Sequence, residues 1–578
     1  STSTSTSTST STFVLKVQYS TTPKSSGIQW LDPAQTADKI HPYMFTQAQA
    51  IHARSILPCQ DAPSAKFTYR ATVHVPPWAT CLMSAVQIHN DNDNINGNDI
   101  GNDIGNDNDK DNDNENVFKW HQKVPIPSYL IALVVGSLQS REVGPRTRVW
   151  SEASVVDQAA YEFHQTEEFI QHAEAIMDQE YVWGRYDLVC LPPSFPYGGM
   201  ENPCLTFVTP TLLTAQAKTL QDGTVQFEKG RELVSVIAHE IAHSWTGNLI
   251  TNHTWEHFWL NEGWTVWLER KIMARVHSPE YFDFDAITGW NALKDSVDEY
   301  GKDHHFTCLK PCLDRVDPDD SFSSVPYEKG FNFLYYLSRV IGEGPFETFA
   351  QAYVQKFKYK TVTTEEFCSF FRQYCAARSL DISQVDFDAW INEPGMPTVT
   401  PKFDDSLSSS SVDLAQAWFD INRMNKSNYK DNDNDGCKNN NAALEKIQNL
   451  PDVSTWTSAQ MVVMLEKLLD ILAEAKESFT IVTLDQMGEQ YQFNTSRNAE
   501  VRFCWQTLCI RSEGEFCLPC VETFIKEQGR MKFIRPLYRE LYRSKFGKTK
   551  AMKWFVEWRS NYHPIAQKMV AKDLEISD

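Results

Sequence analysis

Residues 231–246 read Arg-Glu-Leu-Val-Ser-Val-Ile-Ala-His-Glu-Ile-Ala-His-Ser-Trp-Thr, and two histidines lie four positions apart within them. Val234, Ile237, Ala238 and Ile241 recur at the spacing of one helix face, which predicts an amphipathic helix over residues 231–246. Residues i and i+4 of a helix lie on the same face about one turn apart. The two imidazoles of this stretch can therefore reach one metal ion.

His239, Glu240 and His243 form an HExxH pattern. Zinc is the natural match for two imidazoles in a site that keeps one position open. Glu240 is offset by one residue from the first histidine, so it can face a water molecule at the metal and act as a general base. The pattern also occurs by chance in helices, so a third ligand is needed to support the interpretation.

Glu262 is the candidate third ligand, with 18 residues between it and His243. We predict that it opens a helix over residues 262–272, which an antiparallel return can bring beside the histidines. Two histidines and one carboxylate are a catalytic ligand set. The alternative is a solvated first-turn glutamate favoured by the helix dipole.

Glu269 follows Glu262 by seven residues on the same predicted helix face. It could hydrogen-bond to a zinc-binding histidine. We favour a surface ion pair with Arg270 or Lys271.

Residues 197–202 read Tyr-Gly-Gly-Met-Glu-Asn and lie shortly before the predicted zinc helix. Gly198 and Gly199 allow the backbone to approach another chain closely or to run as an edge strand. Glu201 beside them could hold a free α-ammonium group, which would limit cleavage to the end of a peptide. A plain turn with an exposed glutamate is the alternative.

The charge of the chain is acidic but unevenly distributed. Of the formal net charge of −21 over 578 residues, −8 lies within residues 90–116, which contain eight Asp, one Glu and one Lys. This balance disfavours non-specific binding to nucleic acid or anionic membranes. We interpret the tract as a disordered loop insertion, because it has too few apolar residues to offset the entropy of ordering.

The apolar runs of the chain are short, the longest being residues 129–135, so no membrane insertion is expected. The chain opens with six Ser-Thr repeats and shows no signal peptide pattern. Thirteen cysteines are too few for a disulfide scaffold of this length. A cytoplasmic location with reduced thiols is therefore the expectation.

The predicted fold class is multi-domain α+β. Residues 66–75 alternate as in a strand, residues 129–135 read as a short apolar strand, and residues 153–179 read as one helix. After residue 412 almost every segment is helix-periodic, including 458–476, 500–511, 521–529 and 536–546. Repeated short helices suggest a solenoid-like arrangement. The predicted parts are a disordered repeat (1–12), a β domain (13–139), a zinc catalytic domain (140–393), a linker (394–411) and a helical domain (412–578).

These motifs resemble those of the M1 family of gluzincin aminopeptidases. Longer stretches are similar to the leukotriene A4 hydrolase/aminopeptidase group of that family, namely residues 191–213, 243–249, 323–330 and 527–533. The resemblance runs from about His41 to Asp573 and passes over two Asn/Asp tracts. It implies a partial N-terminal β-sheet domain, a thermolysin-like, mainly α catalytic domain and a C-terminal armadillo-like α-helical domain.

The resemblance also implies roles for individual residues. His239, His243 and Glu262 would bind one Zn²⁺ per chain, Glu240 would be the general base, and Tyr327 would donate its phenol to the developing oxyanion. The implied substrate contacts are Gln47, Gln49, Gly198, Gly199, Met200, Glu201, Asn202, Asp319, Arg530 and Lys532. Of these, Glu201 would hold the substrate amine, and Asp319 matches a pocket aspartate used for epoxide opening. Arg530 and Lys532 would receive a substrate carboxylate, although the residues alone favour a solvated face there.

Phe322 departs from the pattern, because the vertebrate epoxide hydrolases of this group resemble one another in having Tyr at this place. The lost hydroxyl makes peptide chemistry the stronger prediction. The predicted function is a zinc aminopeptidase acting as a monomer on short peptides with a free N-terminus. A lipid epoxide hydrolase using the same zinc is the first alternative, and a non-catalytic peptide-binding relative is the second.

Two further patterns could bind metals. Cys504, Cys509, Cys517 and Cys520 could form a structural zinc site, but only one CxxC pair is present, so we favour buried thiols. Residues 430–436 resemble the start of an EF-hand loop. The loop position for a bidentate Glu is Ala442, so we favour a solvated loop.

Overall fold

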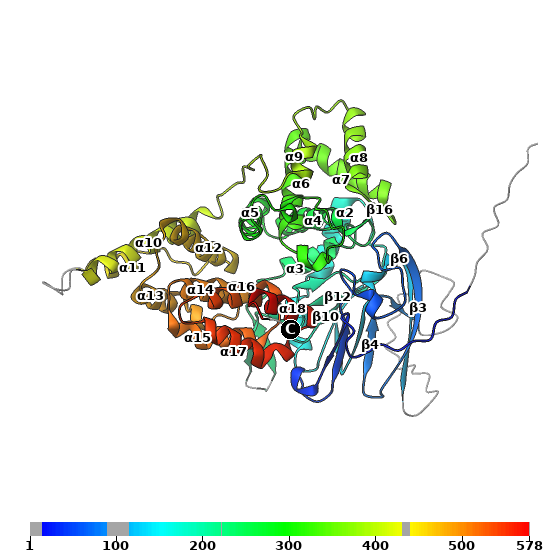
Figure 1. Cartoon of the computed structure of the whole chain (residues 1–578), viewed down its shortest axis with the longest axis horizontal. Helices are drawn as coiled ribbons and strands as arrows, with labels where there is room; N and C mark the ends of the chain where they lie inside the picture. Colours follow the sequence, from blue (N-terminus) through cyan, green and yellow to red (C-terminus); the bar gives the residue numbers. More distant parts are fainter. Residues whose placement is uncertain (1–13, 89–114, 221, 223, 431–439, 577–578) are drawn as a thin grey trace, which may run out of the picture.

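The computed structural model describes residues 14–88, 115–220, 222, 224–430 and 440–576, with side chains undescribed in 428–430 and 440–441. The Ser-Thr repeat, almost all of the 90–116 tract and nearly all of the EF-hand-like stretch lie outside the described residues. The chain forms an N-terminal β part, a middle part with many helices, one five-stranded sheet and two-stranded sheets that include β15 (Thr251–Asn252) and β16 (Thr361–Val362), and a C-terminal helical part (Figure 1). This is the three-part α+β architecture predicted from the sequence.

The N-terminal part contains two sheets. One has the order β1-β2-β7-β4 and the other β3-β6-β5. Their strands are β1 (Ile28–Leu31), β2 (Tyr43–Thr46), β3 (Lys66–Val75), β4 (Thr80–Met83), β5 (Val86–Gln87), β6 (Asn116–Pro127) and β7 (Leu133–Gly136). The prediction of a strand over residues 66–75 is confirmed. The prediction of one strand over residues 129–135 is wrong in its first half, where Ser128–Leu130 form a 3-10 turn after Pro127.

The middle part begins with a mixed sheet of order β11-β12-β10-β9-β8. Its strands are β8 (Gln139–Gly144), β9 (Thr147–Ser151), β10 (Tyr186–Cys190), β11 (Gly199–Met200) and β12 (Leu205–Val208). Strand β11 pairs only with β12, with Gly199 opposite Val208 and Met200 opposite Phe207. The Gly-Gly stretch therefore runs as an edge strand, one of the two possibilities that the sequence left open.

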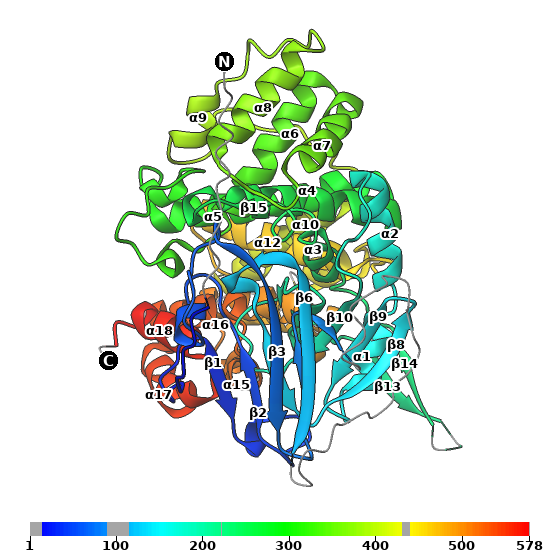
Figure 2. The same ribbon diagram turned by 90° about the vertical axis from the view of Figure 1, so that its right-hand side faces the viewer.

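In the part of the chain that the structure describes, nine α-helices follow or interleave with this sheet. They are α1 (Val156–Glu162), α2 (Thr166–Met177), α3 (Ser235–Ala242), α4 (Trp259–Val276), α5 (Glu280–Tyr300), α6 (Gly330–Ile341), α7 (Glu343–Phe357), α8 (Thr364–Ala376) and α9 (Phe387–Asn392). Figure 2 shows α6 to α9 stacked on the side of α4 away from the N-terminal strands. Two short hairpin strands, β13 (Gln216–Thr219) and β14 (Val225–Glu228), precede α3.

Three predicted helices differ in extent from the observed ones. The 153–179 segment breaks into α1 and α2 at a turn over residues 163–165, and the carboxylate of the buried Glu162 just before it accepts backbone N–H groups of Thr214 and Arg231. Helix α3 is shorter than residues 231–246, since Arg231 has a left-handed backbone with φ of 60°. Helix α4 begins at Trp259, so Glu262 lies within its first turn instead of opening it.

The C-terminal part is entirely helical in the described residues. Its helices are α10 (Ser409–Lys430), α11 (Asn440–Gln448), α12 (Ser458–Ala475), α13 (Ile481–Tyr491), α14 (Ala499–Arg511), α15 (Leu518–Glu527), α16 (Met531–Arg543), α17 (Lys548–Trp558) and α18 (Pro564–Asp573). The helices predicted over 458–476 and 500–511 are confirmed within one residue. Pro536, predicted as a helix start, lies inside α16.

The boundaries of the hydrophobic cores do not coincide with those of the three parts of the chain. One continuous core runs from Leu31 to Ile391, so the β part and the middle part share it. A second core runs from Leu414 to Leu574 within the helical part. No helix among the described residues combines the length and apolar character needed to cross a bilayer.

Candidate metal centre and substrate cleft

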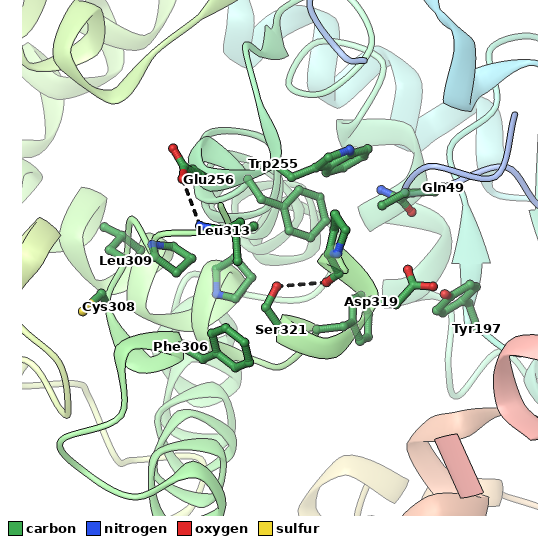
Figure 3. A pocket seen from close by; sticks show the side chains of 16 residues that line it. Gln49, Tyr197, Trp255, Glu256, Phe306, Cys308, Leu309, Leu313, Asp319 and Ser321 are labelled. Atoms are coloured by element: carbon green, nitrogen blue, oxygen red, sulfur yellow. Dashed lines mark hydrogen bonds between the residues drawn. The ribbon is translucent and has the colours of Figure 1, made fainter. Parts of the chain in front are cut away.

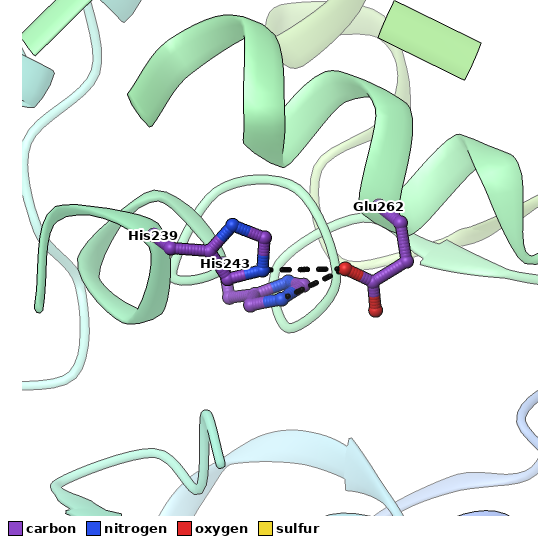
Figure 4. Close-up of side chains that lie close together, drawn as sticks. All are labelled: His239, His243 and Glu262. Carbon is purple, nitrogen blue, oxygen red and sulfur yellow. Dashed lines mark ion pairs between the residues drawn. The ribbon is translucent and has the colours of Figure 1, made fainter. Parts of the chain in front are cut away.

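The two histidines of α3 and the glutamate of α4 converge on one point (Figure 4). The Nε2 atoms of His239 and His243 lie 3.4 and 3.3 Å from the same carboxylate oxygen of Glu262, Oε2. Helices α3 and α4 pack directly against each other. The helical spacing of the histidines and the return through α4 thus produce a cluster with three possible metal ligands.

Hydrogen bonds at the other ring nitrogen fix both imidazoles. His239 Nδ1 lies 2.8 Å from Glu269 Oε2, and His243 Nδ1 lies 3.0 Å from the Thr246 carbonyl and 3.1 Å from Thr265 Oγ1. When Nδ1 carries the hydrogen and donates it, Nε2 is left with its lone pair facing Glu262. This is the tautomer that binds a metal.

The expectation that Glu269 forms a surface ion pair is wrong. Arg270 points to the other side of α4, where it pairs with Asp285 and Glu328, and Lys271 pairs with Glu347. Glu269 remains on the ligand face because it follows Glu262 by seven residues, close to two helical turns.

The ligand cluster fits a divalent cation. Glu262 Oε2 is buried and lacks a hydrogen-bond partner, although both imidazoles face it. Burial would raise the pKa of Glu262, but the two imidazoles that face it at 3.3 and 3.4 Å outweigh burial when they are protonated and lower the pKa to about 2. Two imidazole nitrogens and an ionised carboxylate are the donor set that zinc prefers in open sites.

Glu240 lies beside this cluster under the edge strand β11. A Cβ atom on Gly199 would collide with the Glu240 carboxylate, so only glycine permits this approach. Glu240 is 5% exposed, its Oε2 has no partner, and burial raises its pKa to about 8. A buried carboxyl with a raised pKa next to a ligand cluster suits a general base.

Glu201 follows the glycines and is also buried without a partner for its Oε1. Burial raises its pKa, against the nearby imidazole of His243. Its backbone carbonyl accepts a 2.7 Å hydrogen bond from Asn248 Nδ2, which attaches β11 to the loop after α3. Ligand atoms of Glu201, Glu240 and His243 all lie within 4.8 Å of one another, so this carboxylate belongs to the same site.

Several of the buried polar atoms without partners lie in the ligand cluster or on the segments predicted to line the substrate site. Native proteins leave few buried polar atoms without partners, so a group of them indicates space for a polar ligand. They are Gln47 Oε1, Gln49 Nε2, Glu201 Oε1, Asn202 Nδ2, Glu240 Oε2, Glu262 Oε2 and Arg530 Nε. Met200, in contrast, points inward and its sulfur lies 3.3 Å from Gln47 Nε2.

Tyr327 lies in a π-helical turn, η8 (Val325–Lys329), directly before α6. Its ring stacks on that of His239, with centroids 5.9 Å apart. Burial raises the pKa of Tyr327 well above its ordinary value, so the phenol stays protonated and can donate a hydrogen bond. Arg270 fixes the turn by a bidentate contact, with Nη1 and Nη2 each 3.0 Å from the Glu328 carboxylate.

Asp319 lines a cavity next to the cleft (Figure 3). The cavity walls are mostly apolar and include Tyr197, Trp255, Phe258, Phe306, Leu309 and Phe322. Gln49 also lines it. Asp319 Oδ2 lies 2.9 Å from His52 Nε2, and His52 Nδ1 lies 2.7 Å from Ser26 Oγ, so the N-terminal part orients this carboxylate.

Arg530 and Lys532 have different environments. Arg530 is only 7% exposed, whereas the Lys532 side chain is 54% exposed. The solvated face favoured by the residues alone is therefore wrong for Arg530. A Cβ atom on Gly198 would lie 2.6 Å from Arg530 Nη2, so this glycine makes room for the guanidinium group.

Sequence reasoning missed several residues that hold the site. These are Thr265, Arg270, Glu328, Asn248, His52 and Glu500. Spacing could have indicated Thr265, which lies one helical turn after Glu262. His52 and Glu500 come from distant segments, whereas Arg270, Glu328 and Asn248 lie near the motifs in sequence but make contacts that the local pattern does not indicate.

The four cysteines near residue 510 show no sign of a metal site. Cys504, Cys509 and Cys517 are buried in the second core, and Cys520 is half-buried. In the described part of the chain, the residue groups that could hold a metal do not include them. The prediction of buried thiols is confirmed for the first three.

Comparisons with known proteins match all three parts of the chain. The sequence model of the peptidase family M1 domain matches residues 161–390, that of the peptidase M1 N-terminal domain residues 1–130, and that of the leukotriene A4 hydrolase C-terminal domain residues 456–574. A leukotriene A-4 hydrolase of Xenopus laevis is 43% identical over 569 residues, which cover 98% of this chain and 84% of the relative. A leucine aminopeptidase 2 of Neosartorya fischeri is 40% identical over 563 residues, or 96% of this chain and 82% of the relative.

Solved structures give the same result for the fold. A yeast LTA4 hydrolase in complex with bestatin superposes with a TM-score of 0.81 at 34% identity, covering 96% of this chain and 81% of that one. A native yeast LTA4 hydrolase gives a TM-score of 0.77 at 34% identity, with 96% and 82% covered.

Proposed function

Because the chain belongs to the M1 family of zinc peptidases and carries the leukotriene A4 hydrolase C-terminal domain, we propose that it removes N-terminal residues from short peptides. It is a zinc metalloaminopeptidase of the leukotriene A4 hydrolase type. The observation that carries the proposed substrate is the pair of buried carboxyls without partners, Glu201 and Glu240, beside the ligand cluster.

His239, His243 and Glu262 would hold one Zn²⁺ per chain. When bound, zinc supplies Lewis-acid polarisation of the scissile carbonyl and of a water molecule. The fixed tautomers and the partner-free Oε2 of Glu262 support this assignment.

Glu201 would accept the hydrogen bonds of the peptide's free α-ammonium group. Its burial makes an unpaired charge there costly, so a cationic partner is favoured. Gln47, Gln49 and Asn202 contribute further partner-free polar atoms near it. Holding the terminal amine in place limits cleavage to the first peptide bond.

Glu240 would take a proton from the attacking water and pass it to the leaving amine. Its raised pKa favours the second half of this transfer, because a carboxyl that keeps a proton near neutral pH can deliver it. Tyr327, which stays protonated, would donate a hydrogen bond to the carbonyl oxygen as negative charge develops there. Arg530 and Lys532 would receive the C-terminal carboxylate of a short peptide.

Epoxide hydrolysis of a lipid is a second candidate function. The observation in its favour is the apolar cavity that contains Asp319 next to the cleft, which suits a hydrocarbon chain. Phe322, whose ring lies 6.1 Å from that of Tyr327, offers no hydroxyl there. This makes peptide hydrolysis the principal activity in our proposal.

We further propose that the protein acts as a monomer in the cytosol. Its cysteines in the described residues are free thiols, which is typical of a reducing compartment.

The test combines metal analysis with two assays. We expect about one zinc per chain, hydrolysis of amino-acid p-nitroanilides, and a loss of about 10³-fold or more in kcat for Glu240→Gln with zinc retained. Full peptidase activity in Glu240→Gln would contradict the mechanism. Bound zinc without turnover of either a p-nitroanilide or a lipid epoxide would instead favour a peptide-binding relative.

A further inference from the structure

The basic pair at the end of the cleft lies close to the reacting groups. Gly198 packs against Arg530, and the next residue, Gly199, packs against Glu240. Consecutive Cα atoms are about 3.8 Å apart. A peptide of about three residues lying along β11 could therefore place its scissile bond near Glu240 and its C-terminal carboxylate near Arg530.

A carboxylate of the protein itself already contacts this pair. Glu500 Oε1 lies 2.6 Å from Lys532 Nζ and 3.9 Å from Arg530 Nη1. A substrate carboxylate would seek the same two cations. The Glu500 side chain is 16% exposed and the Lys532 side chain 54%, so the contact is open to solvent on the lysine side.

Glu500 is held in the ionised state. Burial would raise the pKa of its carboxyl, but the ammonium of Lys532 and the guanidinium of Arg530 outweigh it and lower the pKa. It also lies in the first turn of α14, where the helix dipole favours negative charge. With Glu500 ionised, the pair offers a net charge of +1 instead of +2 to an incoming anion.

The two cations differ in how they could respond to a ligand. Arg530 is buried, and its ring contact with Phe533 and its Gly198 contact hold it in place. Lys532 is largely exposed, and an ammonium group on a flexible stem can redirect its three donors. A substrate carboxylate could thus take over Lys532 while Arg530 stays fixed.

We propose that Glu500 is a specificity-determining residue that occupies the basic pair as an internal substitute for the C-terminal carboxylate of a substrate. A peptide must displace it from Lys532 to bind fully. This inference rests on the proposed peptidase function and on the role proposed there for Arg530 and Lys532. This competition weakens the binding of the peptide's C-terminal carboxylate. Substrate selectivity then depends more on the contact between the peptide's N-terminal amine and Glu201.

The test compares a tripeptide with a free C-terminal carboxylate and the same tripeptide as its C-terminal amide. We expect Glu500→Gln to lower KM for the acid about fivefold relative to the amide, because the variant removes the competing charge. Glu527→Gln is the matched control. Glu527 forms a partly exposed ion pair with Arg502 of α14 at 3.1 Å that involves neither Arg530 nor Lys532, and this variant should keep the wild-type acid-to-amide ratio of KM values.

An unchanged acid-to-amide ratio of KM values in Glu500→Gln would overturn the inference. A higher KM for the acid would also overturn it, because Glu500 would then position Lys532 for the substrate. If Glu500→Gln does not fold, Glu500→Asp, which withdraws the carboxylate by one methylene, is expected to change the ratio in the same direction. Failure of the proposed function can be distinguished from failure of this inference, because the wild-type protein would then hydrolyse neither tripeptide.

Discussion

At the scale of single residues, the site is built from side chains that lack partners. A buried polar group without a hydrogen bond costs about 1–3 kcal/mol, more when charged. Glu201, Glu240 and Glu262 each leave one carboxylate oxygen in this state within one cleft. Three such oxygens close together fit the proposed ligands, namely a cation at Glu262, a peptide amine at Glu201 and a water molecule at Glu240.

Glu269 illustrates how one residue acts through another. Its carboxylate accepts the Nδ1 hydrogen of His239 at 2.8 Å and is 14% exposed. We predict that Glu269→Gln weakens zinc affinity by about 10- to 100-fold, because the neutral amide supports the imidazole less strongly. Competition with a chelator measures this affinity.

The control is Glu347→Gln, which removes an exposed ion pair with Lys271 of the same helix and should leave zinc affinity unchanged. Equal zinc affinity in Glu269→Gln and wild type would show that the contact does not support the metal.

At the scale of elements, α4 organises most of the site. Along one helix it carries Glu262, then Thr265 against His243, then Glu269 against His239, and then Arg270 against the π-helical turn η8. The helix is buried almost all round, so its two sides serve different neighbours. One side presents the ligand face to α3, and the other fixes the turn that bears Tyr327.

Arg270 is the buried connection between α4 and that turn. It is 2% exposed and bonds both to Glu328 and to Asp285 of α5. We predict that Arg270→Met destabilises the protein by about 3–5 kcal/mol, since it leaves the Glu328 carboxylate buried without a counter-charge. Thermal or urea unfolding measures the loss, and kcat should fall as Tyr327 loses its support.

The double variant Arg270→Met/Glu328→Gln tests the cause, because it removes the stranded charge and should recover part of the stability. Lys271→Met, which breaks a partly exposed ion pair and the contacts of the ammonium with the Trp267 and Phe282 rings, should cost less, about 1–2 kcal/mol. If the double variant were no more stable than Arg270→Met, charge burial would not be the reason.

At the scale of the whole molecule, the N-terminal β part and the middle part act as one body. They share a core, and Lys66 of β3 crosses between them to donate to the carbonyls of Asn248 and Leu249 at 2.9 and 3.0 Å. Asn248 in turn holds the backbone of Glu201. The position of the Glu201 backbone therefore depends on a strand about 180 residues away in the sequence.

Lys66 predicts a dependence of stability on pH. Burial lowers its pKa from 10.5 to about 7, so between these values the unfolded chain binds more protons than the folded one. Stability contributed by this group therefore falls as pH drops from 10.5 to 7 and levels off below 7. Relative to Lys66→Met, the wild-type protein should gain thermal stability between pH 7 and pH 9.

Lys66→Met also leaves two carbonyls unpaired, so at pH 9 it should be less stable than wild type by about 1–3 kcal/mol. Lys218→Met, which removes a 60% exposed lysine paired with Glu228, is the control and should show no such pH-dependent difference. A stability gap between Lys66→Met and wild type that stays constant from pH 7 to pH 9 would contradict the assigned pKa.

Much of the architecture follows from short-range pattern. Strand β3 and helices α12 and α14 agree with the predicted bounds because side-chain periodicity is a local property. Two features differ from the prediction, namely the break between α1 and α2 and the start of α16 before Pro536. Next to the break, Glu162 accepts hydrogen bonds from the backbone of Thr214 and Arg231, and such contacts with distant segments are not visible in local periodicity.

The sequence by itself determined which residues could form a metal-ligand set, because the spacing of His239 and His243 and the following helix with Glu262 leave few other geometries. It also determined the order of the β and helical parts. Only the tertiary structure decided that Glu269 faces His239, that Arg530 is buried, and that Glu500 occupies the basic pair. The physical reason is that charge pairing and burial depend on which distant surfaces meet, whereas periodicity depends on neighbours along the chain.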